Sequence, residues 1–133
     1  SAQIEEHFDQ PAMKFLVRSV NHELSSDEML EIAQKELKGI ATATHSNSSE
    51  SLLEISAIGV SKGETLAKLA QRLNISAADV ITFGDNPNDI SMLEWSGRSY
   101  AMATAHPDAQ AAAKLIAPEC NDDGVAQIVD EFI

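Results

Sequence analysis

The chain has 133 residues, about the length of one small domain. Its composition is 44% hydrophobic and 23% charged with 6 glycines and 4 prolines, which excludes collagen-like, low-complexity and disordered classes. Nine Lys and Arg residues stand against 21 Asp and Glu residues, giving a net charge of −12. This balance predicts no nucleic-acid partner and no anionic membrane surface, because both require a basic footprint.

Features of the chain also indicate its compartment. No apolar run approaches the roughly 20 residues that cross a bilayer. The acidic N-terminal residues 1–6 lack the basic and apolar regions of a signal peptide. One cysteine, Cys120, excludes an internal disulfide. Together these features predict a cytoplasmic protein.

The first third of the chain has the pattern of a strand, a helix and two more strands. Ser25 and Glu28 have the spacing of a capping box, which predicts a helix start, and Gly39 favours its end. Residues 46–49 are rich in turn formers. The expected elements are a strand over 14–20, a helix over 25–39 and strands over 40–45 and 52–58.

From residue 61 onward, helices alternate with short apolar strands. The expected elements are helices over 61–74, 89–95, 107–114 and 124–132, and strands over 80–83, 99–102 and 115–117. This alternation predicts a parallel sheet covered by helices on both faces, so the fold class is α/β. The rhythm changes near residues 57–60, where we expect a boundary between two regions.

The loop after the strand over 80–83 contains two carboxylates, Asp85 and Asp89. Ligands of open parallel sheets bind at the carboxyl ends of strands, and paired carboxylates suit a hard cation such as Mg²⁺. Gly84 would let the chain bend sharply as it leaves the strand. The same residues also suit an ordinary turn and helix cap, and both interpretations stay open. A calcium EF-hand is excluded, because its glycine and glutamate positions hold Ile90 and Ser96.

Lys62 is expected on the opening turn of a helix, where the helix dipole disfavours a positive charge. This placement indicates a role in holding an anion, although a solvated surface lysine fits equally well. The surrounding residues are not a P-loop, because the Gly-x4-Gly-Lys spacing is missing.

Other polar residues are predicted to be structural. The histidines share no metal-ligand spacing, Asp122 and Asp123 resemble a helix cap, and Cys120 has no evident activating base. The histidines in question are His7, His22, His45 and His106. In the first third of the chain, we expect Arg18, His22 and His45 on the surface, although they could reach a substrate.

Three motifs converge on one family. Gly-Val-Ser-Lys-Gly (59–63), Gly-Asp-Asn-Pro-Asn-Asp (84–89) and Asn-Asp-Asp-Gly-Val-Ala (121–126) resemble the C-terminal half of a haloacid dehalogenase-like hydrolase, specifically a Cof-type phosphatase. The resemblance covers essentially residues 14–133. It implies that residues 58–133 form half of a Rossmann-like parallel sheet with flanking helices, the C-terminal half of the hydrolase core. Residues 1–57 would be a β-α-β-β remnant of an α+β cap domain.

The resemblance also implies roles for four residues. Asp85 would ligate Mg²⁺, Asn88 would contact the phosphate site, and Asp89 would brace the loop and Lys62. Lys62 itself would neutralise the phosphoryl group and the nucleophile. The implied activity is Mg²⁺-dependent hydrolysis of a small phosphorylated metabolite through an aspartyl-phosphate.

Two departures from the family pattern affect this prediction. Ala103 and Thr104 stand where the family commonly has Gly-Asn, and the Asp-x-Asp motif that carries the nucleophile is absent from the sequence. We therefore expect a fragment, inactive alone, whose partner is the missing N-terminal half of the same protein. An exposed sheet edge would favour a homo-oligomer or a domain swap. The alternatives are a non-catalytic interaction or regulatory module of the same fold, and a phosphomutase or phosphotransferase of the superfamily.

Overall fold

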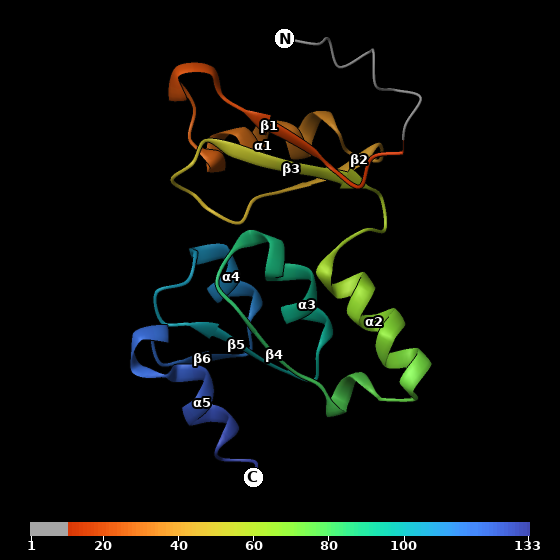
Figure 1. Ribbon diagram of the computed structural model, residues 1–133, viewed down its shortest axis with the longest axis vertical. Coiled ribbons are helices and arrows are strands. Elements are labelled where there is room, and N and C mark those ends of the chain that lie inside the picture. Colours follow the sequence, from red (N-terminus) through yellow and green to blue (C-terminus); the bar gives the residue numbers. More distant parts are fainter. Residues whose placement is uncertain (1–10) are drawn as a thin grey trace.

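The computed structural model describes residues 11–133, which form two three-stranded sheets, one above the other in Figure 1. Residues 1–10, which include His7, lie outside the described residues. The first sheet is antiparallel, with strand order β1-β3-β2. Its elements are β1 (Phe15–Arg18), α1 (Ser26–Glu36), β2 (Ala41–Thr44) and β3 (Leu52–Ala57).

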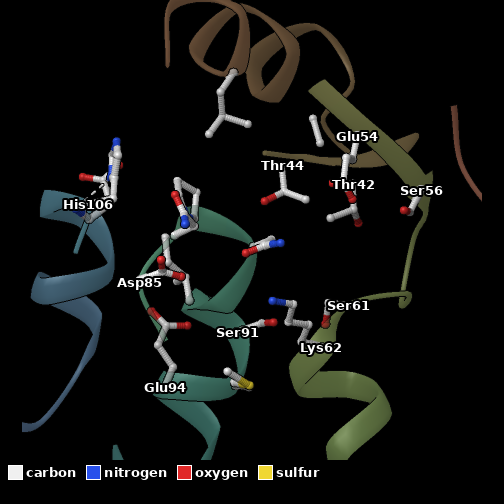
Figure 2. A pocket seen from close by; sticks show the side chains of 18 of the residues that line it. Thr42, Thr44, Glu54, Ser56, Ser61, Lys62, Asp85, Ser91, Glu94 and His106 are labelled. Carbon is white, nitrogen blue, oxygen red and sulfur yellow. Dashed lines mark hydrogen bonds and ion pairs between the residues drawn. The ribbon is translucent and has the colours of Figure 1, made fainter. Parts of the chain in front are cut away.

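Alternation along β2 and β3 gives the first sheet one apolar face and one polar face. Ala43 and Leu53 pack with Met29 and Leu30 of α1 in a small core. The neighbouring positions turn the other way and carry hydroxyl and carboxyl groups into a cleft below the sheet (Figure 2). These cleft residues are Thr42, Thr44, Glu54 and Ser56.

Side chains at the start of α1 fix its position against the sheet. The predicted capping box is present, because the Ser25 hydroxyl accepts from the Glu28 N–H and the Glu28 carboxylate accepts from the Ser25 N–H. The buried Ser26 hydroxyl donates to the carbonyl of Asn47 and accepts from the N–H of Leu52. Ser26 therefore joins the helix to the turn between β2 and β3.

The second sheet is parallel, with strand order β4-β5-β6, and helices flank it. The mixed α/β class expected from the sequence is confirmed. The elements are α2 (Lys62–Leu73), β4 (Ile81–Gly84), α3 (Ile90–Trp95), β5 (Arg98–Met102), α4 (Pro107–Ala112), β6 (Leu115–Ala117) and α5 (Gly124–Val129).

The core of the second sheet centres on β5, the middle strand. Tyr100, Ala101 and Met102 are buried there with Leu93 of α3 and Ala109 of α4. β4 is not wholly apolar, because one of its buried side chains carries a hydroxyl group. That hydroxyl, of Thr82, lies 2.6 Å from the Ser96 hydroxyl, so neither polar group is left unpaired in the core.

Expectations about three helix ends and one helix cap are wrong. α1 ends at Glu36, three residues before the expected Gly39. α4 ends at Ala112, two residues early, because the Lys114 N–H donates to the Ser99 hydroxyl and draws the chain into β6. α5 ends at Val129 rather than near residue 132. Neither Asp122 nor Asp123 caps α5 with its side chain, because Asp123 is left-handed (φ 54°) instead of extended.

No helix among residues 11–133 has the length and apolar character needed to cross a membrane.

Candidate active site

A cleft of about 1650 Å³ separates the polar face of the first sheet from the strand ends of the second. Figure 2 shows Thr42, Thr44 and Glu54 above the cleft and Lys62 and Asp85 below it. The carboxyl end of β4 leads directly into the cleft, which is the position expected for a ligand site of an open parallel sheet.

The Asp89 carboxylate organises the loop that follows β4. Its side chain is almost fully buried. Oδ2 accepts from the backbone N–H groups of Asp85, at 3.0 Å, and Asn86, at 3.2 Å. Oδ1 accepts from Nζ of Lys62 at 2.5 Å. The Asp89 carboxylate therefore fixes both the backbone of the loop and the ammonium group of Lys62.

Gly84 provides the space that the Asp89 side chain occupies. A Cβ at position 84 would lie 2.5 Å from Cβ of Asp89 and 2.9 Å from its Cγ. Gly84 is not left-handed, since the positive-φ glycines among residues 11–133 are Gly39 and Gly59. A left-handed backbone therefore does not explain the glycine at position 84, and the close approach of the Asp89 side chain does.

Lys62 reaches Asp89 because the start of α2 is pressed against α3. Ser61 caps α2 by accepting from the N–H of Glu64. The N–H of Gly63 donates to the Ser91 hydroxyl at 3.0 Å, and a Cβ on Gly63 would lie 2.3 Å from the Ser91 carbonyl oxygen. The Lys62 side chain remains 50% exposed, so its ammonium is paired and still open to the cleft.

Asp85 and Asn88 offer oxygen atoms to the same cleft. The Asp85 side chain is exposed and takes no part in the hydrogen bonds found among residues 11–133. Asn88 Oδ1 is buried and has no hydrogen-bond partner in the described part of the chain. The unpaired carboxylate of Asp85 fits a hard cation such as Mg²⁺, which prefers oxygen ligands.

The other sequence candidates are distributed differently. Arg18 and His22 are exposed, as expected, and do not line the cleft. Thr104, at the departure from the family pattern, lines the cleft, whereas Ala103 is exposed beside it. His45 is fully buried, so its expected surface position is wrong.

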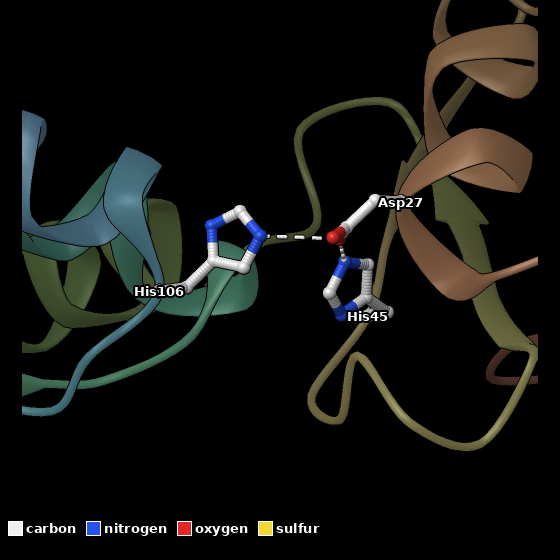
Figure 3. A group of neighbouring side chains, drawn as sticks. All are labelled: Asp27, His45 and His106. Atoms are coloured by element: carbon white, nitrogen blue, oxygen red, sulfur yellow. Dashed lines mark hydrogen bonds and ion pairs between the residues drawn. The ribbon is translucent and has the colours of Figure 1, made fainter.

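Sequence reasoning missed a cluster of three side chains at the edge of the cleft (Figure 3). Asp27 Oδ1 lies 2.7 Å from Nε2 of His45 and 3.1 Å from Nε2 of His106. The three residues are far apart in sequence and follow no motif. The tertiary fold brings them together.

Comparisons with known proteins agree with the fold. A family model described as haloacid dehalogenase-like hydrolase matches residues 1–129. The chain is 30% identical over 106 residues to the 5-amino-6-(5-phospho-D-ribitylamino)uracil phosphatase YwtE of Bacillus subtilis strain 168, covering 80% of this chain and 37% of that protein. It is 33% identical over 106 residues to the phosphatase YwpJ of the same organism, again covering 80% and 37%.

A solved haloacid dehalogenase-like hydrolase from B. subtilis superposes with a TM-score of 0.77 at 29% identity, covering 97% of this chain and 45% of that chain. The chain thus spans less than half the length of these relatives. The strand-end loop and its bracing carboxylate lie within the region that the family model matches. With a match that extends over nearly all its residues, the chain belongs to the haloacid dehalogenase-like hydrolase family.

Proposed function

We propose that the protein containing this chain is a Mg²⁺-dependent phosphatase that acts on a small phosphorylated metabolite. The observation that carries the proposal is the Lys62–Asp89 pair at the mouth of the cleft. A half-exposed ammonium, held in place by a buried carboxylate, is preorganised to stabilise negative charge. The phosphatase names of the relatives YwtE and YwpJ support the same reaction class.

In this proposal, each residue of the site has a distinct task. Lys62 offsets the charge on the phosphoryl oxygens, and Asn88 contacts the phosphate. Asp89 positions Lys62 and holds the backbone of the loop. In this way it also fixes the backbone from which the Asp85 side chain extends. Asp85 would hold Mg²⁺. When bound, the cation would neutralise developing charge on the transferred group.

We further propose a division of labour between the two regions. Residues 58–133 would supply the second half of the catalytic core, and residues 1–57 part of a cap that binds the substrate. The sequence contains no Asp-x-Asp, so we place the aspartate nucleophile in the part of the relatives that lies outside the aligned region. On this basis the 133-residue chain alone does not hydrolyse phosphate esters.

The polar face of the first sheet supports a polyhydroxylated substrate. Thr42 and Ser56 present hydroxyl groups to the cleft, and Glu54 presents a carboxylate. The Thr44 hydroxyl oxygen is buried in the same wall. Such groups exchange hydrogen bonds with the hydroxyls of a sugar or sugar alcohol. The phosphorylated ribityl group in the name of YwtE is of this kind.

The test is a phosphatase assay of the complete natural protein on a panel of phosphate esters, with Mg²⁺ and with a chelator. Lys62→Met and Asp85→Ala are each expected to lower turnover by at least about 100-fold, as loss of one electrostatic group in an active site does. Lys68→Met, on the same helix, and Asp79→Ala are exposed matched controls and should leave turnover within about twofold.

Near-normal turnover of Lys62→Met and Asp85→Ala would overturn the site. Strong hydrolysis by residues 1–133 alone would overturn the placement of the nucleophile.

A further inference from the structure

Asp27, His45 and His106 bring three metal-binding groups together (Figure 3). His106 lies across the cleft from Lys62 (Figure 2). Their donor atoms all lie within 4.8 Å of one another. The cluster is separate from the proposed Mg²⁺ ligands, because it contains neither Asp85 nor Asn88. Two imidazole nitrogens and one carboxylate oxygen form a softer donor set than the oxygens of the loop after β4.

Regular structure fixes the backbone of each donor. Asp27 is on the first turn of α1, between the two residues of the capping box. The buried His45 follows β2 directly, and its carbonyl accepts from the N–H of Asn88. His106 caps α4, and its N–H donates to the carbonyl of Asp85 at 2.8 Å. Sites supported in this way hold their geometry better than sites on free loops.

We propose that these three side chains bind a divalent transition metal of the Zn²⁺ class, with a fourth position open to the cleft. Three protein ligands with one open position are a known arrangement for Zn²⁺. Metal–ligand lengths of about 2.0–2.2 Å place tetrahedral ligand atoms roughly 3.3 Å apart. The present separations of 2.7 Å and 3.1 Å, with a 4.8 Å limit, require only small side-chain movements.

The protons of the two imidazoles are accommodated without net change. In the present arrangement each Nε2–H donates to Asp27, and binding moves each ring proton from Nε2 to Nδ1. Nδ1 of His45 has no hydrogen-bond partner among the described residues, so the shift costs it no bond. Nδ1 of His106 accepts from the Asp108 N–H at 3.2 Å, so protonating it gives up this cap bond of α4. Oδ2 of Asp108, now 3.9 Å from Nδ1, would have to move closer to accept the proton as a carboxylate behind a metal-bound histidine.

The consequence is a crosslink across the cleft. Asp27 and His45 come from the first sheet and its helix, and His106 comes from the second region. A metal held by all three fixes the distance between the two sheets on this side of the cleft.

The experiment uses Co²⁺ as a spectroscopic substitute for Zn²⁺, titrated into the 133-residue chain. One equivalent is expected to give the intense visible absorption of four-coordinate Co²⁺. Asp27→Asn and His106→Gln should abolish this band and weaken Zn²⁺ binding, measured by competition with a chromophoric chelator, by at least about 100-fold. Loss of an outer partner alone costs 10–100-fold, so loss of a ligand should cost more.

Three controls locate the metal. Cys120→Ser and His22→Asn remove other exposed donors and should keep the band; asparagine suits the left-handed backbone at position 22 (φ 54°). Asp85→Asn should also keep it, which separates this site from the proposed Mg²⁺ site.

Histidine NMR provides a measurement that needs no variant. Zn²⁺ should shift the ring signals of His45 and His106 and leave those of His22 in place. A wild-type chain without the Co²⁺ band, a band unaffected by both Asp27→Asn and His106→Gln, or unshifted His45 and His106 signals would overturn the proposal.

Discussion

Asp85 and Asp89 stand in the same short loop, yet their surroundings differ. Asp89 is 3% exposed and accepts three hydrogen bonds, from Lys62 and from two backbone N–H groups. Asp85 is exposed, and its carboxylate makes none of the hydrogen bonds found among residues 11–133. The Asp89 carboxylate therefore contributes to folding, and the Asp85 carboxylate is available for a ligand.

This difference predicts opposite effects on stability. Asp89→Ala is expected to lower the free energy of unfolding by about 2–3 kcal/mol, because two backbone donors and an ammonium lose their acceptor. Asp85→Ala should change it by less than about 0.5 kcal/mol, as is usual for an exposed side chain. Urea denaturation of the chain measures both values. Equal losses for the two variants would contradict the assignment of the brace to Asp89.

The Asp-rich loop also shows how far sequence reasoning reached at the residue scale. The pairing of Asp89 with Lys62 was expected from the family resemblance, and the structure has them in contact. The close approach of the Asp89 side chain to Gly84 was not predicted, because steric contact between a glycine and a side chain five positions later leaves no signature in the sequence.

Among the elements, β1 is linked to β3 by a charged pair. Nζ of Lys14, one residue before β1, donates to Oε2 of Glu54 in β3 at 2.5 Å. This hydrogen bond is the main cause that holds the pKa of Glu54 below its ordinary value of 4.5, and a hydrogen bond from Ser46 adds to it. Partial burial acts in the opposite direction.

The lowered pKa of Glu54 gives a pH-dependent prediction. Glu54→Gln should lower the free energy of unfolding by up to about 1 kcal/mol at neutral pH, the usual range for a partly exposed ion pair. Because the folded-state pKa is below the unfolded one, this contribution is complete above the ordinary value of 4.5. It is lost as the pH falls through the folded pKa. Urea denaturation of both chains at neutral pH and at about pH 3 measures the difference.

Lys14→Met serves as the control, because it removes the other partner. Its pH dependence should match that of Glu54→Gln, and the double variant should add little further loss. A difference between wild type and Glu54→Gln that persists unchanged at about pH 3 would contradict the role of the pair.

Helix starts were more predictable than helix ends. Ser25 and Ser61 are capping residues whose side chains act within one turn, so local sequence specifies them. The end of α4 depends on Lys114, whose Nζ donates to the carbonyls of Ser96 and Gly97. Such a contact with a distant turn is set by tertiary packing, which a single helix sequence does not contain.

At the scale of the whole molecule, α2 leaves an apolar surface uncovered. Leu69 is 51% exposed and Leu73 is 58% exposed, although α2 packs on α3. β4 is also an edge strand of the sheet in the described part of the chain. Exposed apolar surfaces and open strand edges favour association with other chains.

We therefore predict that the isolated chain self-associates. Light scattering should give a mass above 14.3 kDa that rises with concentration. Leu69→Lys combined with Leu73→Lys should shift the chain towards a monomer, because both changes place charge on the apolar surface. Ile32→Lys, at a 52% exposed position on α1, is the matched control and should leave the degree of self-association unchanged. A stable monomer at high concentration would contradict the prediction.

The same scale explains why the Asp27, His45 and His106 cluster escaped prediction. Short motifs reveal ligands that share one helix or loop, as in residues 84–89. These three residues belong to α1, to the end of β2 and to the start of α4. Their convergence requires the first sheet to lie over the second, and neither sheet's sequence pattern specifies that arrangement.

The hydrogen bond from the Asn88 N–H to the His45 carbonyl, 3.2 Å long, gives the cleft a mechanical property. It joins the loop after β4 to the end of β2, so tilting the first sheet away from the second must break it. The rate at which the Asn88 amide exchanges its proton with solvent therefore counts the openings of the cleft. Each opening also removes one restraint from the loop that carries Asp85, while the Asp89 brace stays in place, so substrate entry and the release of that restraint are set by one motion.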